Sequence, residues 1–141
     1  MVVYGISLAG WFYGPVIIVI ILFGLLYALR SQIMPYHCDV LETSWEDIDP
    51  KYQLMLRALM NGGGYYSLST GLFMLVLLLI PFRNGEDWAA YAIGGIGLVG
   101  SLPLGYIVYR VKKYTAGNPP FGLMIVVNFL LLGGLVVSLC N

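Results

Sequence analysis

The chain has 141 residues, with seven basic and seven acidic side chains and hence a formal net charge of zero. Counted with glycine and without tyrosine, apolar residues make up about 65% of the sequence, against about 45–50% in soluble domains. This composition excludes a soluble globular domain and a disordered chain, and the lack of a basic excess excludes nucleic acid as a partner.

All charged side chains fall into three short stretches, which leave four uncharged blocks. The blocks are residues 1–29, 58–82, 88–109 and 114–141. Each exceeds the roughly 20 apolar residues that an α-helix needs to cross the hydrocarbon core of a bilayer. The sequence therefore predicts an all-α fold, a polytopic four-helix transmembrane bundle that forms a single domain over residues 1–141.

The first transmembrane helix is expected over about residues 12–30. Trp11, Phe12 and Tyr13 form an aromatic cluster typical of a membrane interface. Pro15 fits the first turn of a helix, where no amide donor is needed. No basic residue precedes the apolar run and no small-residue cleavage site follows it, so we expect this segment to be retained and not cleaved as a signal peptide.

The loop at residues 31–49 carries five of the seven acids and the only histidine of the chain. His37, Cys38 and Asp39 are adjacent, and adjacent side chains rarely converge on one metal ion. We therefore expect neither a metal ion nor another cofactor. A haem held between two chains by paired His37 residues is an alternative that no motif supports.

The same loop raises an interfacial enzyme as an alternative function. His37 and Cys38 lie next to each other, but no third group has the spacing of a known catalytic triad, so no catalytic residue is predicted. Ser44 with Asp47 resembles a capping box, which predicts a short interfacial helix anchored by Trp45.

The second transmembrane helix is expected over about residues 54–81, within a helix that starts a turn earlier. Asp49 can accept hydrogen bonds from free backbone amides as an N-cap, and Pro50 suits the first helical position. Pro81 and the Asn84-Gly85 turn should end this helix.

The third and fourth helices are expected over about residues 88–111 and 120–140. Asn84 and Asp87 resemble a capping pair for the third helix. Asn118 and Pro119 repeat the arrangement of a cap followed by proline, and should start the fourth helix.

The basic residues beside the four spans predict the orientation, because positive side chains are retained in the cytoplasm during insertion. Six basic residues fall on one side: Arg30, Lys51, Arg57, Arg110, Lys112 and Lys113. Only Arg83 falls on the other side. We therefore expect a plasma-membrane or inner-membrane protein with loops 31–49 and 112–118 in the cytoplasm and both termini outside.

Two seams of small residues predict close helix packing. They are spaced by four, which places the members of each seam on one helix face: Gly63, Ser67 and Gly71, and Gly97, Ser101 and Gly105. Small residues allow helix backbones to approach in lipid, where apolar side chains gain little by contacting each other. We expect the two seams to pack against each other in the hairpin closed by Asn84-Gly85.

An uncharged polar layer in the inner half of the bundle provides the candidate ligand-binding residues: Arg57, Asn61, Tyr65, Tyr106 and Asn128. The three glycines at 62–64 leave room nearby for a helix, a lipid tail or a ligand. Hydrogen bonding between helices is the favoured explanation of such a layer, and a ligand pocket is the alternative that stays open.

The leading function hypothesis is a non-catalytic accessory subunit or a small lipophilic-ligand-binding protein. Its expected partners are membrane lipids, further copies of the chain or other membrane subunits. The alternative is a small oligomeric transporter or channel, or an interfacial enzyme that uses His37 and Cys38. A conducting oligomer should show a polar stripe through the outer half of the membrane, and the segment after Gly71 shows none.

Overall fold

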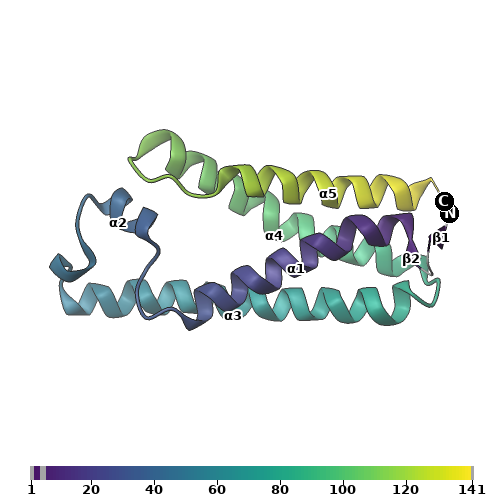
Figure 1. Ribbon diagram of the computed structural model, residues 1–141, viewed down its shortest axis with the longest axis horizontal. Coiled ribbons are helices and arrows are strands. Elements are labelled where there is room, and N and C mark those ends of the chain that lie inside the picture. Colours follow the sequence, from purple (N-terminus) through teal and green to yellow (C-terminus); the bar gives the residue numbers. More distant parts are fainter. Residues whose placement is uncertain (1, 4–5, 141) are drawn as a thin grey trace.

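The computed structural model describes residues 2–3 and 6–140 and consists almost entirely of helices (Figure 1). Four of them are long and apolar enough to cross a membrane: α1 (Leu8–Leu29), α3 (Pro50–Leu77, continued by the π-helix η2, Leu78–Phe82), α4 (Asp87–Tyr114) and α5 (Phe121–Leu139). Strands β1 (Val2–Val3) and β2 (Ile6–Ser7) form a two-residue antiparallel pairing. The prediction of a helical chain with four helices of membrane-spanning length is confirmed.

The loop between α1 and α3 contains more structure than the sequence predicted. Helix α2 (Pro35–Leu41) was not foreseen, and a 3-10 turn, η1 (Trp45–Asp47), occupies the place of the expected short helix. The Ser44 hydroxyl donates to Asp47 Oδ2 at 2.7 Å, although the serine caps no backbone amide. The start of α3 is as predicted, because Asp49 Oδ1 accepts a hydrogen bond from the Lys51 amide at 2.8 Å and Pro50 is the first helical residue.

Four other residues do not play the helix-end roles predicted for them. Helix α1 begins at Leu8, so Pro15 lies inside it and not in its first turn. Helices α4 and α5 are preceded by Glu86 and Pro120, and neither has a side-chain cap, so Asn84 and Asn118 do not play that role. Pro81 does not end α3 but lies within η2, where the wider π turn accommodates a residue without an amide hydrogen.

The long helices associate as two pairs. Helix α1 packs along α3, and helix α4 packs along α5, while α1 also crosses α5. The first pair meets backbone to backbone: a Cβ at Gly24 would lie 2.5 Å from the Leu68 nitrogen, and one at Gly64 would overlap the backbone of Ala28. Helices α3 and α4 have few contacts beyond η2.

The expectation that the two small-residue seams face each other is therefore wrong. Ser67 and Gly71 lie against α1: the Ser67 hydroxyl donates to the Ile20 carbonyl at 3.1 Å, and a Cβ at Gly71 would lie 2.7 Å from Ile21 Cγ1. Gly63 is exposed and has no neighbour within 4 Å of a Cβ position.

The seam of α4 faces α5 instead. A Cβ at Gly97 would lie 2.5 Å from Leu131 Cδ2, Ser101 bonds to Asn128, and the nearest atom to a Cβ at Gly105 is Asn128 Nδ2 at 3.7 Å. Small residues fix which face of a helix is packed, but they do not identify the helix opposite, because any neighbouring backbone can approach them.

The main core lies at the end of the bundle that holds β1, β2 and the C-terminal end of α5, which we call the sealed end (Figure 1). Its fully buried side chains come from all four long helices: Tyr13, Val16, Ile17, Met74, Ile93 and Leu131. The Tyr13 hydroxyl donates to the Ala90 carbonyl at 3.1 Å, which satisfies the one polar atom of this side chain. At the opposite end, called the loop end, a smaller cluster of Tyr27, Ile33 and Met60 lies beneath α2.

Candidate functional site

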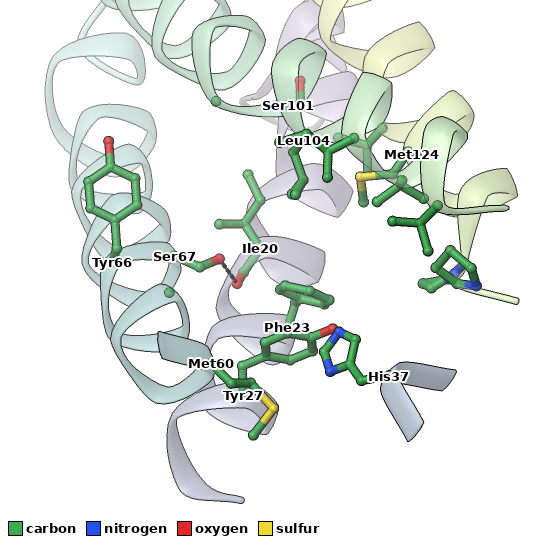
Figure 2. Close-up of a pocket in the computed structure, with 18 of the residues that line it drawn as sticks. Ile20, Phe23, Tyr27, His37, Met60, Tyr66, Ser67, Ser101, Leu104 and Met124 are labelled. Atoms are coloured by element: carbon green, nitrogen blue, oxygen red, sulfur yellow. Dashed lines mark hydrogen bonds between the residues drawn. The ribbon is translucent and has the colours of Figure 1, made fainter. Parts of the chain in front are cut away.

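A crevice of about 670 Å³ separates the two helix pairs. Its volume falls within the range of about 300–1,000 Å³ that is typical of small-molecule sites. All four long helices and α2 line it, among others through the residues labelled in Figure 2: Ile20, Phe23, Tyr27, His37, Met60, Tyr66, Ser67, Ser101, Leu104 and Met124. The crevice is therefore a property of the whole bundle and not of one loop.

The crevice lies where α1 has crossed from beside α5, at the sealed end, to lie along α3 toward the loop end (Figure 1). Glycines leave part of each wall of the crevice without side chains. Gly63 on α3 and Gly100 on α4 line the crevice, and a Cβ at either would meet no atom within 4 Å. Helix α2 covers the loop end with Tyr36, His37 and Val40.

The walls of the crevice are apolar and uncharged. Among the residues that the structure describes, no Lys, Arg, Asp or Glu lines it. The hydroxyls of Ser67 and Ser101 already donate to protein acceptors, the Ile20 carbonyl at 3.1 Å and Asn128 Oδ1 at 2.9 Å. A molecule in this crevice would meet hydrocarbon along most of its length.

Three polar rings stand together at the loop end of the crevice. Tyr27 on α1 and Tyr36 on α2 share a hydrogen bond between their hydroxyls, and His37 lies edge-on to both rings, with centroid distances of 6.3 Å and 4.3 Å. Figure 2 shows His37 beside the hydroxyl end of Tyr27. Burial lowers the pKa of His37 below its ordinary value of 6.5, so the imidazole is neutral at pH 7.

The environment of Cys38 does not activate a nucleophile. Burial raises the pKa of its thiol, and the neighbouring charges of Asp39 and Glu46 act in the same direction. A catalytic cysteine needs the opposite shift, because the thiolate is the reactive form. Within the described part of the chain, no cluster of three or more His, Cys, Asp or Glu side chains is arranged to hold a metal ion.

The five polar residues proposed from the sequence as ligand contacts do not come together, and none of them lines the crevice. Arg57 is exposed and borders a separate small depression beside Trp45. Tyr65 and Tyr106 are 56% and 61% exposed, on the outer surface. The distance along each helix placed these residues at a common depth, but depth does not determine the direction in which a side chain points.

The two asparagines of this set form hydrogen bonds between or along helices. Asn61 Nδ2 donates to the carbonyls of Ala28 and Arg30, at 2.5 Å and 3.3 Å, and so satisfies the C-terminal end of α1. Asn128 accepts from Ser101 and donates to the Met124 carbonyl at 2.8 Å. Of the two interpretations left open by the sequence, these contacts match the packing interpretation.

Sequence reasoning missed Tyr27 and Tyr36 and considered His37 only as a metal ligand or catalytic group. A signal was present, since Tyr27 lies one turn before the end of the first helix and Tyr36 directly precedes His37. The interpretation required knowing that the loop folds back over the helix ends as α2, which no residue spacing indicates.

No protein-family model, no curated protein and no solved structure matches this chain. The geometry of the crevice therefore carries the functional argument.

Proposed function

We propose that this chain is a non-catalytic integral membrane protein that binds a lipophilic molecule in the crevice between its helix pairs. The observation that carries the proposal is the uncharged apolar space of about 670 Å³, bounded by both pairs and covered at one end by α2. Apolar pockets with a few polar groups at one end are typical of sites for small lipophilic ligands. The alternative, a transporter or channel, would have to form between copies of the chain, because the side chains of Tyr13, Ile17 and Leu131 are fully buried at the sealed end.

The partners proposed for the chain are membrane lipids, with self-association or other membrane subunits as a further part of the proposal. Most large apolar side chains on the outer faces of the four long helices are exposed, as they are in helices surrounded by lipid tails. Native mass spectrometry of the protein released from nanodiscs measures both quantities, the number of chains and the number of bound small molecules.

The test of the binding site uses glycines that differ only in what they face. Gly63→Leu combined with Gly100→Leu places two side chains in the crevice without overlapping any atom within 4 Å of the new Cβ positions. Gly62→Leu combined with Gly95→Leu is the matched control, because these positions are equally open but do not line the crevice. We expect the first variant to lose its co-purifying lipophilic molecule and the control to retain it. A wild-type protein with no such molecule, or a crevice variant that retains it, contradicts the proposal.

The proposed orientation has loops 31–49 and 112–118 in the cytoplasm and both termini outside. Cys38 and Cys140 are free cysteines near opposite ends of the bundle. A membrane-impermeant maleimide applied to intact cells should label Cys140 and leave Cys38 unlabelled until the membrane is opened. Single-cysteine variants with Cys38→Ser or Cys140→Ser assign the signal, and labelling of Cys38 from outside reverses the orientation.

A further inference from the structure

Free hydrogen-bonding capacity in the crevice is confined to its loop end. Three of the hydroxyls on its walls are already used: Ser67 and Ser101 as described above, and Thr70, which donates to the Tyr66 carbonyl at 2.9 Å. Tyr66 itself is 75% exposed, at the edge of the crevice. The remaining polar groups are those of Tyr27, Tyr36 and His37, beneath and within α2.

His37 is the unsatisfied member of this group. Its backbone amide bonds to the Met34 carbonyl and its ring contacts two tyrosines, but neither ring nitrogen has a hydrogen-bond partner among the described residues. A neutral imidazole carries one donor and one acceptor. His37 is half-buried and neither of its ring nitrogens is fully enclosed, so both can be reached by a polar atom at the loop end of the crevice, which a hydrogen bond would stabilise there.

The lack of charge along the walls limits what that polar atom can be. A phosphate, sulfate or ammonium head group inside the crevice would have no counter-charge among the described lining residues, and an unpaired buried charge is strongly unfavourable. A hydroxyl or carbonyl oxygen has no such requirement. A neutral imidazole can donate to either group and can also accept from a hydroxyl.

We propose that the occupant is a neutral lipid whose hydroxyl or carbonyl oxygen hydrogen-bonds to His37 beside the Tyr27–Tyr36 pair, with its hydrocarbon along the crevice toward the sealed end. This inference rests on the proposed function and adds the ligand class and the residue that selects it. The neutral head lies under α2, and the tail lies over Gly63 and Gly100, where neither helix wall carries a side chain.

The test is photo-crosslinking of the full chain in phosphatidylcholine nanodiscs with two probes. One is a diacylglycerol with a diazirine in one acyl chain, and the other is the phosphatidic acid with the same chains. We expect the diacylglycerol to label the wild type, with peptides of the crevice walls modified, and the phosphatidic acid to label it at least about threefold more weakly, because its head has no counter-charge in the crevice.

Two variants of His37 isolate the head-group contact. His37→Phe keeps a ring against the tyrosines but removes both nitrogens, and it should reduce diacylglycerol labelling about threefold to tenfold, the range for loss of one or two hydrogen bonds. His37→Gln retains a donor and an acceptor and should keep most of the labelling. Tyr65→Phe, on the outer surface and away from the crevice, is the control and should be unchanged.

The outcomes separate the two proposals. If both His37 variants label like the wild type while the Gly63→Leu and Gly100→Leu pair blocks labelling, the head-group assignment is overturned and the binding crevice stands. If that glycine pair leaves labelling unchanged, the proposed function itself is overturned. Equal labelling of the wild type by phosphatidic acid overturns the neutral-lipid assignment even where His37→Phe fails to fold.

Discussion

The sealed end of this bundle and its crevice use the same abundant residue, glycine, to opposite effect. At the sealed end, glycines receive large side chains: a Cβ at Gly134 would lie 2.5 Å from Tyr13 Cε1, and one at Gly133 would lie 2.7 Å from Phe12 Cε1. In the crevice, about midway along α3 and α4, Gly63 and Gly100 face open space. A glycine thus produces close packing where a large side chain lies opposite, and a cavity where none does.

This contrast has a physical basis in lipid. Apolar side chains gain little by leaving lipid tails for each other, so helices associate where shapes interlock and separate where they do not. The aromatic side chains Phe12 and Tyr13 interlock with α5, whereas the neighbours of Gly63 and Gly100 across the crevice do not reach them. In the proposed membrane surroundings, lipid hydrocarbon would fill the crevice at little cost in free energy.

The largest expected effect comes from two adjacent glycines of α3. Gly64→Leu should destabilise the fold by about 3 kcal/mol or more, because the new side chain overlaps the backbone of Tyr27 and Ala28 and must separate α1 from α3. Gly63→Leu, one residue away, should change stability by less than about 1 kcal/mol, because it points into open space. Thermal unfolding in detergent measures both. Similar melting temperatures for the two variants would contradict this prediction, because a glycine that faces another backbone would then tolerate leucine as well as one that faces open space.

A pair of leucine truncations compares the two ends directly. Leu131 is fully buried at the sealed end, and Leu131→Ala should cost about 2–4 kcal/mol by leaving a cavity. Leu104 is 39% exposed and lines the crevice, so Leu104→Ala should cost about 1 kcal/mol or less, since little packing is lost. Reversible unfolding of both variants in the same detergent provides the measurement. A larger loss for Leu104→Ala would mean that the loop end is as tightly packed as the sealed end.

The smallest expected effect concerns the polar contact between α4 and α5. Asn128→Leu should reduce stability by about 1 kcal/mol or less, because it removes one hydrogen bond from Ser101 and one to the helix's own backbone. The double variant Asn128→Leu with Ser101→Ala should cost no more than Asn128→Leu alone, because no hydroxyl is then left without an acceptor. Ligand binding should persist in both variants, and a loss of the co-purifying molecule would place Asn128 in the binding site after all.

The sequence was sufficient to predict the helices but not their pairing. Uncharged blocks longer than a membrane-spanning helix, together with Asp49 and Pro50, place α3 within a few residues, since these signals are local. The partner of each helix depends on complementary shape across space. Gly24, where α1 approaches the backbone of α3, stands alone in an otherwise apolar run and belongs to no seam of small residues.

The site was less accessible to sequence reasoning than the fold. Gly63 could be recognised as a place without a side chain, and it does line the crevice, but the polar residues chosen around it point elsewhere. Asn61 and Arg57 attracted attention because polar side chains are unusual in apolar helices. In the structure, Asn61 donates a hydrogen bond to the Ala28 carbonyl, and Arg57 is exposed. Two of the three polar rings at the loop end of the crevice, Tyr36 and His37, come from α2, and the position of α2 depends on how the loop between α1 and α3 folds back over the helix ends.

The order of the connections has a mechanical consequence. The links at residues 30–49 and 115–120 each join the two helices within one pair, so the chain passes from one pair to the other only once, at residues 83–86 at the sealed end. The two pairs are therefore covalently linked at one end of the bundle only, the sealed end. At the loop end the two helix pairs are held together by non-covalent contacts, such as those of Tyr36 and Val40 with Gly117. Rotation about this single covalent link would move the loop end furthest, which would give the proposed ligand a lateral route from lipid while every helix stays intact.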